Sequence, residues 1–140
     1  MADQAMLARS PALPLESLRA AFGRRLTLHA PLARLTAARV GGEADALVTA
    51  SSADELAATV RWLWQVDLPF LILGGGSNML ISDAGVRGVV VVNKARGVRF
   101  EESPSPTVWA ESGANFGALA RQAALKGLGG LEWAAGIPGT

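Results

Sequence analysis

The sequence contains no cysteine, and it has a single histidine, His29. Without cysteine the chain has no disulfide, no thiolate chemistry and no Cys-based metal site. One imidazole cannot build a metal centre, because such centres need several converging ligands. We therefore interpret His29 as a surface or packing residue and expect no bound metal.

The chain also lacks a charge excess and a long apolar run. Lysine and arginine number 13 against 12 acidic residues, a net charge of +1, so no basic excess indicates a nucleic-acid partner. No apolar stretch approaches the ~20 residues that a membrane helix needs. The N-terminus carries Asp3 and Glu16 and has no long apolar centre, unlike a signal peptide. We expect a soluble, cytoplasmic, single-domain protein of 140 residues with no membrane contact.

The most informative feature that is present is a glycine loop. The apolar run Phe70–Leu73 leads directly into Gly74, Gly75, Gly76, Ser77 and Asn78. Glycine lets a ligand approach the backbone closely, and consecutive N–H groups form a nest for phosphate oxygens. The alternative is a tight turn, for which one glycine would suffice. We interpret the loop as a phosphate-binding loop.

Two familiar phosphate loops do not match. A P-loop needs Gly-Lys followed by Ser or Thr, and no lysine lies near this loop. The dinucleotide fingerprint GxGxxG needs a glycine where this chain has Met79, and a helix must follow it. Here residues 79–81 are expected to be extended and residues 82–85 to turn. The predicted loop joins strand to strand, so loop amides rather than a helix end would hold the phosphate.

A second glycine turn lies at Gly136-Ile137-Pro138-Gly139. Pro138 fixes φ and offers no N–H, while its flanking glycines permit sharp bends. As structure alone this is a tight turn after a helix. Two such turns in one small domain favour a dinucleotide ligand over a lone phosphate.

Patterning in the first half predicts two helices and little else that is regular. We expect residues 1–14 to be mobile, residues 27–39 to wrap over the surface without a period, and a short strand at 46–49. One amphipathic helix is predicted, ended early by Gly23, from the spacing of Leu15, Leu18, Phe22 and Leu26. A capping box, Ser52 to Glu55, opens the second helix. Its apolar stripe is expected to comprise Leu56, Val60, Leu63 and Trp64.

The second half predicts strands and one further helix. Strands are expected at residues 70–73 and 89–92, the latter covered on both faces, and a strand pair at 98–101 and 108–111. Asn115 can cap a helix whose buried face would comprise Phe116, Leu119, Ala120, Ala123 and Ala124. The order of elements indicates an α+β fold, mixed and without regular alternation.

Four segments together carry a family resemblance: Arg39-Val40-Gly41-Gly42, the stretch Leu73–Leu80, Ser82-Asp83-x-Gly85-x-x-Gly88, and Gly127–Thr140. From about Leu26 onward the chain resembles the N-terminal part of the UDP-N-acetylenolpyruvoylglucosamine reductases (MurB), flavoenzymes of peptidoglycan synthesis. The resemblance implies a FAD-binding domain of the PCMH/vanillyl-alcohol-oxidase type, built from two small mixed α/β subdomains. It implies an N-terminal extension with a short helix at 1–25 and an incomplete FAD-binding domain at 26–140, without the substrate domain. The cofactor-binding residues it implies are Arg39, Val40, Gly41, Gly74, Gly75, Gly76, Ser77, Asn78, Gly136, Ile137 and Gly139.

The resemblance further implies that hydride passes from NADPH through FAD to the enolpyruvyl group of a UDP-sugar. The family's catalytic arginine, serine and glutamate have no counterpart in these 140 residues, and neither Arg121 nor Glu132 substitutes for them. The aromatic residue that the family often shows after Thr-Thr is also absent, since the segment reads Leu35-Thr36-Ala37-Ala38-Arg39. We therefore assign no catalytic residue and expect the chain alone to be inactive, with exposed apolar surface that promotes self-association.

Two other functions stay open. One is a FAD-dependent oxidase or dehydrogenase of the same fold, although many of those attach flavin covalently through His or Cys. The other is a non-catalytic nucleotide-binding domain that keeps the glycine loops without the chemistry.

Overall fold

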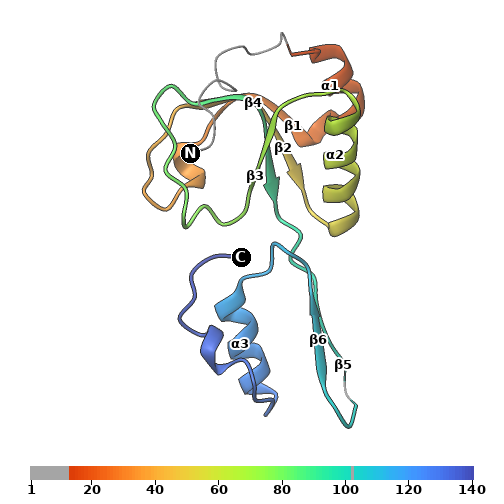
Figure 1. Ribbon diagram of the computed structural model, residues 1–140, viewed down its shortest axis with the longest axis vertical. Coiled ribbons are helices and arrows are strands. Elements are labelled where there is room, and N and C mark those ends of the chain that lie inside the picture. The colour runs from red at the N-terminus through yellow and green to blue at the C-terminus, as the bar shows by residue number, and fades with distance from the viewer. Residues whose placement is uncertain (1–12, 102) are drawn as a thin grey trace.

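The computed structural model describes residues 13–101 and 103–140, so the predicted mobility of residues 1–14 lies outside it except at positions 13 and 14. Figure 1 shows two regions joined where the chain leaves β4, and we call residues 13–93 the first region and residues 94–140 the second region. The first region contains α1 (Leu15–Phe22), η2 (Gly23–Arg25), β1 (Leu26–Pro31), η3 (Ala33–Leu35), β2 (Glu43–Ala50), α2 (Ala53–Gln65), β3 (Phe70–Leu73) and β4 (Val86–Asn93). The second contains β5 (Val98–Glu101), β6 (Thr107–Ala110), α3 (Phe116–Leu125) and η4 (Glu132–Ala134).

A four-stranded sheet in the order β1-β2-β4-β3 organises the first region. Strand β4 runs parallel to both β2 and β3, while β1 is antiparallel to β2. The predicted strand at 89–92 is confirmed as the centre of the sheet, and its four valines are at most 5% exposed. A continuous β-branched run suits this place because both faces of a central strand are covered.

Two apolar clusters, one on each face of the sheet, form the core. Because side chains alternate along a strand, Val89 and Val91 join one cluster and Val90 and Val92 join the other. The first cluster includes Leu18 of α1 and Leu63 of α2. Loops cover the second cluster, and Figure 1 shows residues 32–42 and 74–85 on the side of the sheet opposite α1 and α2. The glycine loop therefore belongs to a layer that the core holds in place.

Both predicted helix caps are confirmed. Ser52 Oγ accepts from the N–H of Glu55 at 3.2 Å, and the Glu55 carboxylate accepts in return from Ser51 N–H at 2.8 Å, one residue earlier than expected. Asn115 Oδ1 accepts from Ala118 N–H at 2.8 Å. Such bonds satisfy backbone donors that have no partner inside the helix.

The buried faces of these helices differ in part from the prediction. Helix α2 buries Thr59 and Leu63, whereas Trp64 is 72% exposed, so its predicted place in the stripe is wrong. Helix α3 buries Gly117, Leu119, Ala120 and Ala123, and Ala124 is exposed. Tryptophan at position 64 instead meets Phe70 edge-on with ring centroids 6.0 Å apart, at the rim of the sheet.

The prediction of an irregular surface segment at residues 27–39 is wrong over its first part, where β1 forms. Gly23 ends α1 as expected, with φ of 50°, but Leu26 continues into a strand rather than into the helix. Strand β1 is an edge strand in which half-buried or buried residues alternate with exposed ones, and His29, one of the exposed residues, has φ of 51°. Strand β2 likewise spans Glu43–Ala50, longer than the predicted 46–49, while residues 79–81 form no strand.

The second region contains the predicted hairpin, β5 paired antiparallel with β6, followed by α3. Glu111 ties this hairpin to the first region, since its carboxylate accepts from Gly97 N–H at 2.6 Å and from Ala53 N–H, at the start of α2, at 2.7 Å. The α+β class is confirmed. Among the described helices, none is long and apolar enough to cross a membrane.

Candidate nucleotide-binding site

The first glycine loop follows β3 at the carboxyl end of the sheet, where ligands bind in open α/β sheets. Gly76 has φ of 70°, and a Cβ at this position would overlap the carbonyl oxygen of Leu35. The Gly76 carbonyl accepts from Ala37 N–H at 3.0 Å. Gly76 is therefore required by both its conformation and the close approach of the 35–37 segment.

The same loop presents a row of backbone donors. Within residues 13–101 and 103–140, the N–H groups of Gly76, Ser77 and Asn78 have no hydrogen-bond acceptor. The Gly75 N–H donates to Thr140 Oγ1 at 3.4 Å. Consecutive N–H groups of this kind suit the oxygens of a pyrophosphate.

The second glycine turn lies against the first loop, although Gly75 and Thr140, which meet there, are 65 positions apart in the sequence. A Cβ on Gly74 would come within 2.5 Å of Thr140 Oγ1, and a Cβ on Gly139 would lie 3.6 Å from Ser77 Oγ. In Figure 1 the C-terminus accordingly lies between the two regions. Gly139 is thus a predicted residue of the second turn that lies against the first loop. By contrast, Gly136 has open space around it, and Ile137 is 43% exposed.

The Arg39–Gly42 turn lies beside this site. Thr36, which is buried, holds the turn by donating its hydroxyl to Val40 O at 2.9 Å. Arg39 and Gly41 both have positive φ, and Gly42 N–H donates to Ser82 O at 2.9 Å. The turn thus packs on the segment that follows the glycine loop, and the side chains of Arg39 and Val40 are exposed.

Sequence reasoning assigned no role to two hydroxyls that shape the site, those of Thr36 and Thr140. Thr36 is the one hydroxyl residue in the stretch Leu35-Thr36-Ala37-Ala38. Its role depends on its burial, which cannot be read from the sequence alone. Thr140 directly follows the second glycine turn.

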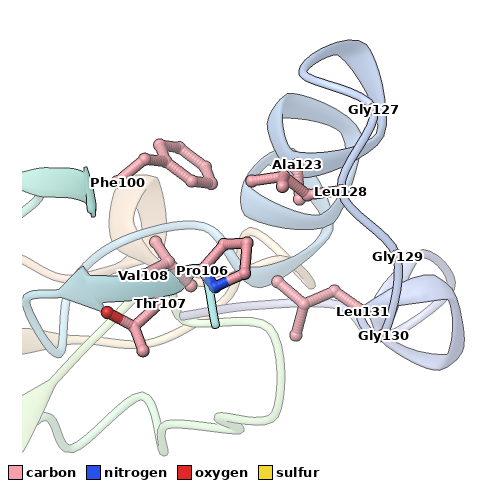
Figure 2. A pocket seen from close by; sticks show the side chains of 10 residues that line it. All are labelled: Phe100, Pro106, Thr107, Val108, Ala123, Gly127, Leu128, Gly129, Gly130 and Leu131. Carbon is pink, nitrogen blue, oxygen red and sulfur yellow. The ribbon is translucent and has the colours of Figure 1, made fainter. Parts of the chain in front are cut away.

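A cavity apart from the glycine loops lies between the β5–β6 hairpin and α3. The cavity has a volume of about 490 Å³. Figure 2 shows hairpin side chains facing those of α3 and of the segment after it. Thr107 supplies the only polar side-chain group among its ten lining residues. A charged pyrophosphate would lose its hydration there without gaining donors, so this cavity does not suit it.

The single histidine is remote from the glycine loops. Its side chain is 79% exposed and lies 3.9 Å from Glu43 Oε2 on the edge of the sheet. In the described part of the chain, no three His, Asp or Glu side chains converge as metal ligands.

Comparison with known proteins places this geometry in a family. A model described as FAD binding domain matches residues 44–140. The UDP-N-acetylenolpyruvoylglucosamine reductase of Rubrobacter xylanophilus is 44% identical over 110 residues, which are 79% of this chain and 37% of that protein. The reductase of Synechococcus sp. strain JA-3-3Ab is 41% identical over 132 residues, or 94% of this chain and 42% of that protein. The chain thus spans well under half the length of these curated relatives.

Two solved structures share the fold. UDP-N-acetylenolpyruvylglucosamine reductase (MurB) from Thermus caldophilus superposes with a TM-score of 0.56 at 29% identity, covering 81% of this chain and 38% of that one. The p-cresol methylhydroxylase structure with substrate bound gives a TM-score of 0.51 at 18% identity, over 81% of this chain and 24% of that one. The second likeness concerns the fold alone.

Proposed function

Since this chain belongs to the FAD-binding domain family, we propose that it holds FAD as the cofactor-binding part of a UDP-N-acetylenolpyruvoylglucosamine reductase. The observation that carries the proposal is the meeting of the two glycine segments, with Thr140 against Gly74 and Gly75. The domain in this proposal spans residues 26–140, preceded by an extension at 1–25.

The residues present fit the cofactor. Gly76, Ser77 and Asn78 would bind the pyrophosphate through their N–H groups, and Gly74 and Gly75 would let it approach the backbone. Gly139 closes the other side, and Arg39, Val40 and Gly41 would line the same cleft beside Gly136 and Ile137. When bound, the flavin supplies hydride transfer, and the protein contributes binding and orientation.

The proposed reaction is reduction of the enolpyruvyl group of the UDP-sugar to UDP-N-acetylmuramate with NADPH, in the cytoplasm. The 140 residues alone are proposed to be inactive, because none of them is assigned to substrate or proton transfer. An exposed histidine on the sheet edge and the lack of cysteine favour flavin that is not covalently attached.

The first experiment measures flavin in the purified chain. We expect yellow protein, or uptake of added FAD with quenching of flavin fluorescence, and release of all flavin on acid precipitation. Colourless protein that also takes up no FAD would contradict the cofactor assignment. Flavin that stays with the precipitate would favour the covalent oxidases instead.

The second experiment separates the reductase from the other two functions. Residues 26–140 replace the matching segment of the Rubrobacter xylanophilus reductase, and NADPH oxidation is measured with and without the UDP-sugar. Substrate-dependent NADPH oxidation supports the reductase assignment. A chimera that folds and holds FAD but oxidises no NADPH would favour the oxidase or the non-catalytic domain.

A further inference from the structure

Asn115 uses both ends of its side-chain amide. Oδ1 accepts from Ala118 N–H at 2.8 Å, which caps α3, and Nδ2 donates to the carbonyl oxygen of Gly139 at 3.3 Å. In the opposite orientation, donor would face donor and acceptor would face acceptor, so these two bonds fix the amide. The cap of one helix is thereby bonded to the second glycine turn.

The first two residues of α3, Phe116 and Gly117, contact the same turn and the residues just before it. The Phe116 N–H also donates to Gly139 O, at 3.3 Å, and its ring meets Trp133 edge-on with centroids 5.3 Å apart. A Cβ on Gly117 would lie 3.3 Å from Ala135 O, so this glycine permits the approach. Asn115 and the first two residues of α3 thus contact the chain between Trp133 and Gly139.

The comparison with α2 shows what is specific to this cap. Ser52 caps α2 through one acceptor bond, and Asp, Ser and Asn cap helices about equally well. Capping alone therefore does not require an amide. Asn carries the acceptor for the helix and the donor for Gly139 on two separate atoms, whereas a serine hydroxyl would have to reach both partners with one oxygen.

We propose that Asn115 is a positioning residue that fixes the second glycine turn and, through Thr140, presents it to the first glycine loop; its effect on cofactor affinity rests on the proposed FAD function. Gly139 is bonded to Asn115, and the next residue, Thr140, accepts from Gly75 N–H. These contacts link the start of α3 to Gly75, which directly precedes the row of donors at Gly76–Asn78. Pre-ordering both walls of a site lowers the cost of binding.

The test substitutes Asn115→Asp in the whole chain. Aspartate keeps the capping acceptor and removes the donor, while its charge suits a helix N-terminus. Ser52→Asp is the matched control, because it adds the same charge at the cap of α2, far from the glycine turn in sequence. Asn115→Ala removes the cap and the donor together. The measurements are the thermal midpoint, the FAD dissociation constant, and hydrogen exchange at two amides: that of Phe116, which donates to Gly139 O, and that of Ile137, which donates to Ala134 O at 3.2 Å.

We expect Asn115→Asp to leave the thermal midpoint near that of the control. The FAD dissociation constant should rise about fivefold, as expected for loss of one hydrogen bond from a pre-ordered turn. The Phe116 and Ile137 amides should exchange several-fold faster than in the control. Unchanged exchange in Asn115→Asp, or exchange raised equally by Ser52→Asp, overturns the positioning role.

FAD uptake by the wild-type chain tests the proposed function, and hydrogen exchange tests the role of Asn115 separately. If the wild-type chain takes up no FAD, the proposed function fails, while hydrogen exchange still decides whether Asn115 holds the turn. If wild type and Asn115→Asp bind FAD equally well despite faster exchange, the turn contributes nothing to binding, and the role of Asn115 in the site is wrong.

Discussion

The first and second regions are built differently. Both apolar clusters lie in the first region, on the two faces of its sheet, and their members include fully buried Leu18, Leu63 and Val91. The second region has a two-stranded hairpin and one helix, and its buried apolar residues are mostly small: Ala95, Leu119, Ala120, Ala123 and Ala134. A hairpin of two strands is marginal by itself. The first region therefore has a hydrophobic core of its own, whereas the second has regular secondary structure with few large buried side chains.

The proposed site is formed by both regions. Its row of N–H donors comes from the first region, and its second wall comes from the region with little core. Residue 140 joins them through one hydrogen bond of 3.4 Å to Gly75. The first wall should thus be rigid and the second should depend on the contacts of α3.

The largest expected effect is that of Leu63→Ala. Leu63 is fully buried between α2 and the sheet, so its truncation should lower the free energy of unfolding by about 3 kcal/mol. Leu119→Ala, in the second region, is the matched change and should cost less than about 2 kcal/mol, because the other buried apolar residues of that region are alanines. Chemical denaturation followed by tryptophan fluorescence and circular dichroism measures both. Equal losses would contradict the contrast between the two cores.

A smaller effect is expected for Gly76→Ala, which changes the wall of the proposed site that belongs to the first region and should be rigid. Positive φ alone costs roughly 1–2 kcal/mol for a residue with a Cβ, and the overlap with Leu35 O adds to this. Gly127→Ala is the control, since Gly127 has φ of 73° but a Cβ added there would meet nothing within 4 Å. We expect a loss of about 2 kcal/mol or more at Gly76, with loss of FAD binding, and about 1 kcal/mol at Gly127 with binding retained. Similar losses at both sites would show that the close approach to Leu35 does not matter.

Gly75→Ala should affect binding more than folding. A Cβ there would make ordinary contacts, 3.6 Å from Thr140 Cγ2 and 3.9 Å from Gly139 Cα, so the fold should hold. The added methyl group would occupy space between the two glycine segments. We expect a FAD dissociation constant raised about tenfold, equivalent to about 1.4 kcal/mol, with a nearly unchanged thermal midpoint. Unaltered affinity would mean that the cofactor does not enter between these segments.

The smallest change in stability is expected for Leu125→Gln, at the end of α3. Leu125 is 88% exposed, so the free energy of unfolding should change by less than about 0.5 kcal/mol. We propose that exposed apolar residues of the second region, with Trp109 and Trp133, promote self-association. Light scattering should therefore show association of the wild-type chain and less in Leu125→Gln. A wild-type chain that is monomeric at high concentration would contradict the proposed self-association.

Local signals predicted much of this structure. Strand β3 has the predicted bounds because its apolar run stops abruptly at the glycines, and both caps formed where hydroxyl or amide residues precede apolar periods. Strand β1 was missed for a physical reason. The helical spacing of α1 extends by coincidence to Leu26, which assigned the first residue of the strand to the helix, although residues 26–31 alternate between buried or half-buried and exposed positions.

The site was only partly predictable. The glycine segments were recognised from composition, but their meeting depends on α3 returning the chain to the sheet, and no local pattern encodes that. The same holds for Thr36, whose hydroxyl matters because the fold buries it. The assignment of all the predicted cofactor-binding residues stays a prediction.

The most direct test of the two-walled site is a titration of the wild-type chain with FAD, followed by the backbone amide resonances in heteronuclear NMR. We predict saturable binding, with the largest shifts at Gly75, Gly76, Ser77 and Asn78 and further shifts at Gly139. Absence of binding would contradict the account. So would shifts confined to the apolar cavity beside Phe100 and Leu131.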